Sequence, residues 1–228
     1  MTETVPSSSG QRSRSHRTPA RAEIVGSLLR PPEIRRIFEQ VFAGKDTQIT
    51  NFVEDERAAD LVRLNELADA AIKTAVSRQI DVGLDVVSDG EMRRALFENS
   101  LYEGIEGISP NPRKMEFTDE TGEVLRPPST PMITGPVRRV SSPVAREAAF
   151  LASITDYPFK VTFPAPSMLL FPETVFGESY HDRDEMVADM IRVYRELVAD
   201  VLAAGCRYVQ FDFPIYPLLV DRHSVAAL

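Results

Sequence analysis

The sequence predicts an α/β fold made of successive strand–helix units with parallel strands. Short apolar runs alternate with helical periods from about Glu23 onward. Residues 83–89 and residues 205–212 repeat one order: each follows a long helix, begins with a glycine and runs through a short strand to an aspartate. Repeated units of this kind need crossover connections, which make their strands parallel. The 228 residues are 43% hydrophobic and 26% charged, which is the composition of an ordinary globular protein.

Composition disfavours several classes of function. No apolar run approaches the ~20 residues of a membrane helix, and the N-terminus lacks the apolar stretch of a signal peptide. We therefore expect a cytoplasmic protein that does not act at a membrane. The single cysteine, Cys206, cannot form an internal disulfide. A net charge of −8 without a basic stripe argues against nucleic acid as the main partner.

The first elements follow a tail that we expect to be disordered. Residues 1–22 are rich in Ser, Arg and Pro and show no apolar period, so they cannot bury enough surface to offset the entropy of ordering. The folded domain is expected over residues 23–228. Residues 24–27 form its first strand, and Pro31 and Pro32 then open a helix.

The second unit has a long helix over residues 53–80. Its apolar residues recur every three or four positions, with charges on the other face. Gly83 stands where a helix C-cap glycine belongs. Residues 84–88 then form a β-branched strand that runs into Asp89.

Residues 104–140 interrupt the alternation and predict a hairpin insertion. The segment is rich in proline and contains a Thr121-Gly122 turn. Two extended stretches, residues 114–118 and residues 131–140, flank this turn and could pair. Ser142 is then expected to cap a helix that begins at Pro143 and ends near Ile154.

The last two strands enclose another helix. Residues 160–163 form the third strand, and residues 206–211 form the fourth, which ends at Asp212. Asp182, three residues before Glu185, predicts the N-cap of the helix between them. Five apolar or aromatic residues line one face of that helix: Met186, Met190, Tyr194, Leu197 and Val201.

Polar residues stand where the predicted strands end: Ser27, Asp89, Glu91, Ser167 and Asp212. In a (β/α)8 barrel, functional residues gather at the carboxyl ends of the strands. Asp212 ends a buried apolar strand, where an unpaired charge is costly, and this favours a functional or paired role. Asp89 and Glu91 could equally border a solvated turn, and Ser27 could simply cap the following helix.

Other reactive residues have ordinary structural interpretations. Cys206 begins a strand and is expected to be a small core residue. His181 and His223 are expected at the surface. Arg93 and Arg94 could meet a carboxylate or phosphate of a substrate, or lie in a solvated loop.

Five segments, taken in order, resemble the catalytic barrel of the cobalamin-independent methionine synthase family. They are Val25–Ser27, Val87–Arg94, Met132–Pro136, Val161–Ser167 and Ala204–Asp212. The likeness includes the Gly-Ser that opens the barrel, the Gly-Glu pair after the second strand and the Gln-x-Asp of the fourth strand. The resemblance implies a (β/α)8 TIM-barrel fold, of which this chain would hold the first four βα units and the hairpin insertion.

The resemblance also implies a zinc-dependent S-methyltransferase of methionine biosynthesis, of the 5-methyltetrahydropteroyltriglutamate–homocysteine type. A methylated folate would donate the methyl group, and zinc would hold the homocysteine thiol as the reactive thiolate. Ser27 and Glu91 would hold the amino-acid end of the substrate. Asp212 would bind its amino group and is the catalytic candidate. A related alkyl-thiol transferase or a uroporphyrinogen decarboxylase-like enzyme is an alternative.

Two departures from the family limit this expectation. The family's Asp-Glu-Pro is here Asp212-Phe213-Pro214, so a carboxylate is missing. The family's zinc ligands, a His-x-Cys pair, a Glu and a distant Cys, belong to later strands, and none of His16, His181 and His223 has a cysteine two residues on. We therefore assign no metal-binding residue. We expect a truncated protein with reduced or no activity alone, or one whose barrel is completed by a second chain or a homodimer; the alternative is a non-catalytic binding protein.

Overall fold

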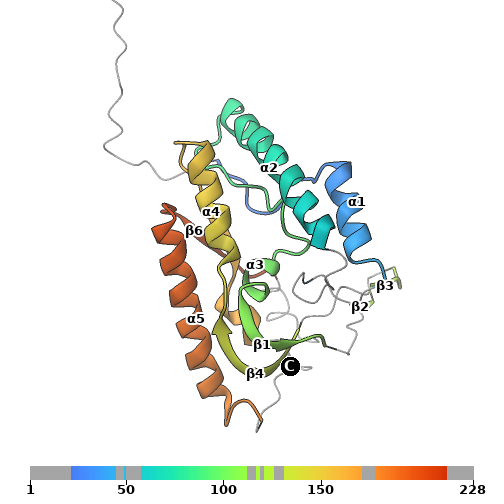
Figure 1. Cartoon of the computed structure of the whole chain (residues 1–228), viewed down its shortest axis with the longest axis vertical. Coiled ribbons are helices and arrows are strands. Elements are labelled where there is room, and N and C mark those ends of the chain that lie inside the picture. The colour runs from blue at the N-terminus through green and yellow to red at the C-terminus, as the bar shows by residue number, and fades with distance from the viewer. Residues whose placement is uncertain are drawn as a thin grey trace, which may run out of the picture.

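The computed structural model describes residues 22–44, 49, 58–111, 117–118, 121–125, 131–170 and 178–214 (Figure 1). All structural statements below concern these residues, so residues 1–21 of the predicted tail lie outside them. The elements in chain order are α1 (Pro32–Val41), α2 (Ala58–Asp81), α3 (Asn99–Tyr102), β1 (Ile105–Ser109), β2 (Phe117–Thr118), β3 (Val124–Leu125), β4 (Met132–Arg139), α4 (Pro143–Ile154), β5 (Val161–Pro164), the 3-10 helix η3 (Pro166–Leu170), α5 (Arg183–Ala203) and β6 (Val209–Asp212).

Four parallel segments lie side by side in sequence order, as the strand–helix repeat predicts. A bridge joins Glu23 to Val86, a second joins Val87 to Phe159, and β5 pairs with β6 in parallel. The first two predicted strands are therefore reduced to bridging residues. The α/β fold is confirmed, and the described strands do not close a barrel.

Helices α1 and α2 pack together beside the first two segments (Figure 1). Pro31 is the N-cap residue of α1, and Pro32 occupies the first helical position, where its missing N–H costs nothing. Helix α2 covers the described part of the predicted span, since residues 53–57 lie outside the described residues. Gly83 ends it with a φ of 84°, the left-handed conformation that a C-cap glycine adopts.

Helices α4 and α5 pack against each other along the second half of the chain (Figure 1). The Asp182 carboxylate accepts a hydrogen bond from the Glu185 N–H at 3.0 Å, so the predicted cap of α5 is confirmed. Ser142 is the N-cap residue of α4 and Pro143 its first residue, as predicted, but the Ser142 side chain makes no capping hydrogen bond. Met186 and Met190 are buried in the core, as predicted.

The middle region forms two antiparallel pairs. The Thr121-Gly122 turn joins β2 to β3, while β4 pairs with β1. The predicted pairing of residues 114–118 with residues 131–140 is therefore wrong. A turn sequence determines only which residues next to it pair. Strand β4 instead pairs with β1 across a long connection, and it buries Ile133 and Val137. The status of residues 104–140 as an insertion stays a prediction.

A bulge lets β1 follow β4 closely. Gly107 has a φ of 86°, and a Cβ there would lie 2.6 Å from the Pro136 carbonyl oxygen, so only glycine fits. Among the described helices, none has the length and apolar character needed to cross a membrane.

Candidate functional site

The structure brings the ends of the first, second and fourth parallel segments together. The Leu28 N–H donates to the Gly90 carbonyl at 3.0 Å, which places the segment of Ser27 beside the turn of Glu91. Asp212 lies close enough to Glu91 for its charge to raise the pKa of that carboxyl, although burial raises it more. Ser27 is exposed, and because Pro31 caps α1, Ser27 does not. The predicted site residues therefore share one end of the sheet.

The turn that carries Glu91 has an unusual backbone. Glu91 has a φ of 57°, in the left-handed region that non-glycine residues rarely occupy. The Glu91 N–H donates to the Asp89 carboxylate at 2.9 Å, and Gly90 sits where a Cβ would be 2.8 Å from the Leu28 side chain. Such strain persists only where the surroundings over-determine it, and it concentrates at functional sites.

Arg30 holds this turn from the outside. Its Nη2 donates to the Glu91 carbonyl at 3.1 Å and also to the Arg94 carbonyl. Its guanidinium lies 5.6 Å from the centre of the Phe38 ring on α1. Arg30, which precedes α1 and packs on its Phe38 side chain, therefore supports the backbone conformation of Glu91.

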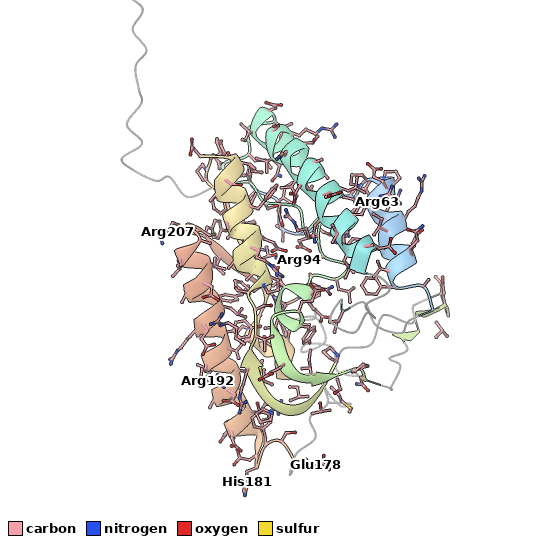
Figure 2. All side chains as sticks on the ribbon, viewed as in Figure 1. Arg63, Arg94, Glu178, His181, Arg192 and Arg207 are labelled. Carbon is pink, nitrogen blue, oxygen red and sulfur yellow. The ribbon has the colours of Figure 1, made fainter. Side chains whose placement is uncertain are left out.

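Arg94 is the best-anchored charge in the site. Its side chain is 3% exposed and makes two contacts to the Glu147 carboxylate of α4, at 2.9 Å from Nε and 2.5 Å from Nη2. It also donates to the Thr162 hydroxyl and carbonyl of β5, both at 3.0 Å. Burial opposes its charge, but Glu147 outweighs this and holds the pKa of Arg94 above its usual value. The solvated-loop interpretation of Arg94 is wrong, because its side chain is buried and engaged by Glu147 and Thr162. Figure 2 labels Arg94 among the side chains.

The carboxyl groups of the site all have raised pKa values. Burial, and then the charge of Glu147, raises the pKa of Asp89 to about 6, and its Oδ2 has no hydrogen-bond partner. Burial also raises the pKa of Glu91, against the opposing charge of Arg94. Burial raises the pKa of Asp212, against a hydrogen bond from Gln210. The solvated-turn interpretation of Asp89 and Glu91 is wrong, since both are buried.

This arrangement suits a cationic group. Asp89, Glu91 and Asp212 lie at the strand ends, whereas the nearby Arg94 is already engaged by Glu147. An ammonium group placed beside these carboxylates would pair with them and favour their charged forms. The chemistry of the site is therefore that of a cluster of buried carboxylates with raised pKa values.

Sequence reasoning missed the residues that support the site. Glu147 is 4% exposed on a helix face that also buries Val144, Ala148 and Leu151. A charge on an apolar helix face was the available signal, because such a residue needs a buried partner. Thr162 lies on the buried strand β5 and Lys160 immediately precedes it, and neither carried a distinguishing sequence pattern.

The described residues do not fit a zinc site. Within the described ranges, no three His, Cys, Asp or Glu side chains are grouped so that they could hold a metal ion. Cys206 is buried in the core, as predicted; burial raises the pKa of its thiol, which donates to the Tyr208 carbonyl at 3.2 Å. His181 is 92% exposed at the surface, as predicted (Figure 2). His16 and His223 lie outside the described residues, and Ser167 is half-buried on η3.

Residues 44–224 match the family model described as cobalamin-independent synthase, catalytic domain. The chain belongs to this family. It is 30% identical to YxjH, an uncharacterized protein of Bacillus subtilis strain 168, over 96% of its length and 55% of that protein. It is 26% identical to a 5-methyltetrahydropteroyltriglutamate–homocysteine methyltransferase of Thermotoga sp. strain RQ2, over 84% of its length and 24% of that enzyme.

The fold is likewise similar to solved members of the family. A putative vitamin-B12-independent methionine synthase from Listeria monocytogenes superposes with a TM-score of 0.59 and 26% identity, over 82% of this chain and 50% of that one. The family predicted from the sequence is confirmed. The chain spans about half the length of YxjH and of this solved relative.

Proposed function

We propose that this chain carries the amino-acid-binding part of a thiol methyltransferase site, with a homocysteine-like thiol as methyl acceptor. The observation that carries the proposal is the convergence of Glu91, Asp212 and the Ser27 segment at one end of the parallel strands. The Thermotoga relative is named for methyl transfer to homocysteine, and a methylated folate is the proposed donor by the same likeness.

Each site residue has a role that its surroundings support. Glu91 and Asp212 would pair with the substrate ammonium group, whose positive charge offsets the cost of two neighbouring carboxylates. Ser27, exposed at the rim, would donate a hydrogen bond to the substrate carboxylate. Asp212 would be the catalytic candidate because it would contact the amino group of the thiol substrate. Arg94 would act through its position and its charge, since its guanidinium is occupied by Glu147 and Thr162 and favours the charged forms of Glu91 and Asp212.

Zinc enters the proposal only because members of the family use it in general. A catalytic zinc ion needs about three protein ligands and one open position. The described residues offer no such set, so the ligands would have to come from other residues. We therefore derive no step through the metal.

We further propose that the four parallel segments correspond to the first half of a (β/α)8 barrel, with residues 104–140 as an insertion. No strand in the described part of the chain pairs with the outer edge of β6, and Phe211 on that strand is 49% exposed. A second chain or a second copy could continue the sheet there, because an open edge presents unpaired backbone groups.

Solution mass tests the second-copy version of this arrangement. Phe211→Glu should reduce self-association, whereas Ile191→Glu should leave it unchanged, since Ile191 is a similarly exposed residue on α5, at 46%. A monomeric mass for the unaltered chain would exclude the homodimer.

Calorimetry with L-homocysteine tests the proposed site. Glu91→Gln should weaken binding by about tenfold, the loss of one charge-assisted contact. The control Glu33→Gln, exposed on α1, should bind as the unaltered chain does. An unaltered chain that binds no homocysteine would refute the proposal.

A turnover assay then separates methyl transfer from binding alone. Methyl transfer from a methylated folate, measured with and without added zinc, would establish an enzyme. Binding without turnover would support the alternative of a non-catalytic binding protein. That alternative is favoured by Phe213, which stands where the family has a carboxylate.

A further inference from the structure

A second polar network connects the interior of the sheet to Asp212. The Lys160 side chain is 1% exposed, and its Nζ lies 2.6 Å from Glu23 Oε2 and 2.6 Å from Gln210 Oε1. The Gln210 Nε2 donates to the Val25 carbonyl at 2.9 Å and to the Asp212 carboxylate. The network therefore runs from the first segment through the third and fourth strands to the candidate site.

We propose that Lys160, acting through Gln210, is a positioning residue that sets the orientation and the charge of the Asp212 carboxylate. The ligand-binding consequence of this inference rests on the proposed function. The effect on Asp212 itself does not, because it is a property of the free protein.

The first step of the argument is the orientation of the Gln210 amide. A lysine ammonium group has only donors, so it can meet only the carbonyl oxygen of the amide. The amide NH2 of Gln210 must then point the other way, toward Asp212 and the Val25 carbonyl. Without Lys160 the amide could rotate by half a turn, and its oxygen would face the carboxylate and repel it.

The second step concerns the alternation of side chains along β5. Lys160 lies between the bridging residue Phe159 and the start of β5. Residues two apart on extended chain lie on the same face, so Lys160 and Thr162 project to one side. Thr162 accepts from and so anchors Arg94, while Lys160 engages Gln210. Thr162 of β5 and Lys160 just before it therefore support the two proposed ammonium-binding carboxylates. The Thr162 hydroxyl lies 3.5 Å from Glu91 Oε1, and Lys160 reaches Asp212 through Gln210.

The third step concerns the charges that face Asp212. Burial raises its pKa, and three groups oppose this: the Gln210 hydrogen bond, the charge of Arg94 and the charge of Lys160. The third nearby charged group is Glu91, whose negative charge interacts unfavourably with that of Asp212. Loss of Lys160 removes one positive charge near Asp212. It also lets the Gln210 amide turn its NH2 group away from Asp212, so both changes raise the pKa of Asp212.

The sign of the pH effect follows. A carboxyl group binds an ammonium ligand only when it is ionised, so affinity falls as the pH drops through its pKa. Lys160→Met should raise the pKa of Asp212. The acid limb of homocysteine binding should consequently move to higher pH.

Carbon-13 NMR of labelled aspartate carboxyl groups in the whole chain provides the test, with the Asp212 signal assigned by its loss in Asp212→Asn. Lys160→Met and Gln210→Leu should each move the Asp212 titration to higher pH. Lys160→Arg should restore most of the original position, because it keeps the charge and has only donors. Lys73→Met, which removes an exposed lysine of α2, is the matched control and should have no effect.

Each outcome decides the inference. An Asp212 titration that is the same in Lys160→Met as in Lys73→Met would overturn it. If Lys160→Met does not fold, Gln210→Leu removes the same donor without changing any charge, and an unshifted titration there overturns the inference as well. Failure of the unaltered chain to bind homocysteine would refute the proposed function and leave the NMR result standing.

Discussion

Replacing Glu147 by glutamine removes the carboxylate that neutralises the buried Arg94. The two side chains are 5% and 3% exposed and share two short contacts. Breaking a buried ion pair at one partner costs about 3–5 kcal/mol, because the remaining charge is left uncompensated. A glutamine oxygen can still accept one hydrogen bond, so we expect a loss of about 3 kcal/mol for Glu147→Gln. That is a large fraction of the ~5–15 kcal/mol by which domains are stable.

Urea denaturation followed by circular dichroism measures this loss against a matched control. Glu196→Gln makes the same chemical change in an ion pair with Arg139 at 3.1 Å, where the glutamate side chain is 37% exposed. Surface pairs contribute about 0–1 kcal/mol, so the control should change stability little. Equal losses in the two variants would refute the claim that burial makes the Arg94 pair important.

A double replacement separates the charge from the packing. Arg94→Met combined with Glu147→Leu removes both charges and leaves apolar side chains. Such replacements of buried pairs are often neutral, so the double variant should be more stable than Glu147→Leu alone. A double variant that is less stable than the single one would show that the Thr162 contacts of Arg94 dominate.

Three further predictions concern local features. Because burial raises the pKa of Asp89 from 3.8 to about 6, the folded state retains its proton to higher pH than the unfolded state. The unfolding free energy of the unaltered chain should therefore fall relative to Asp89→Asn as the pH rises through that window. Asp182→Ala should cost about 1 kcal/mol in urea denaturation, whereas Ser142→Ala, without a capping bond, should cost less. Gly90→Ala should cost about 1–3 kcal/mol, because its φ is +65°, whereas Gly26→Ala should be nearly neutral by the same assay.

Local chemistry was sufficient to predict much of the fold from the sequence. The alternation of strands and helices follows from the apolar period of each segment. The glycine caps after α2 and α5 and the Asp182 cap involve residues within one helical turn of each other. These features depend on local backbone geometry and on hydrogen bonds between nearby residues, so the residue types in the sequence predict them directly. The ordered motifs likewise sufficed to identify the family, which the match over residues 44–224 confirms.

The sequence placed Asp212 correctly at the end of β6, whereas the first two predicted strands proved to be bridging residues, and the roles of the site residues stay proposals. Parallel strands place their carboxyl ends at one edge of a sheet, so the strand pattern alone was enough to expect Glu91 and Asp212 near each other. Nothing in the sequence indicated that Ser27 would be exposed or that Glu91 would adopt a left-handed backbone. Both depend on how the first segment packs against the second.

Composition, periodicity and motif order by themselves determined the α/β class, the Asp182 cap, the glycine caps after α2 and α5, and the family of this protein. Tertiary structure alone decided that Arg94 pairs with Glu147, that Lys160 reaches Asp212 through Gln210, and that β4 joins β1. The physical reason is the distance along the chain: these partners are 53, 50 and about 30 residues apart. A buried charge must find a partner, and only the packing of distant segments determines which one it meets.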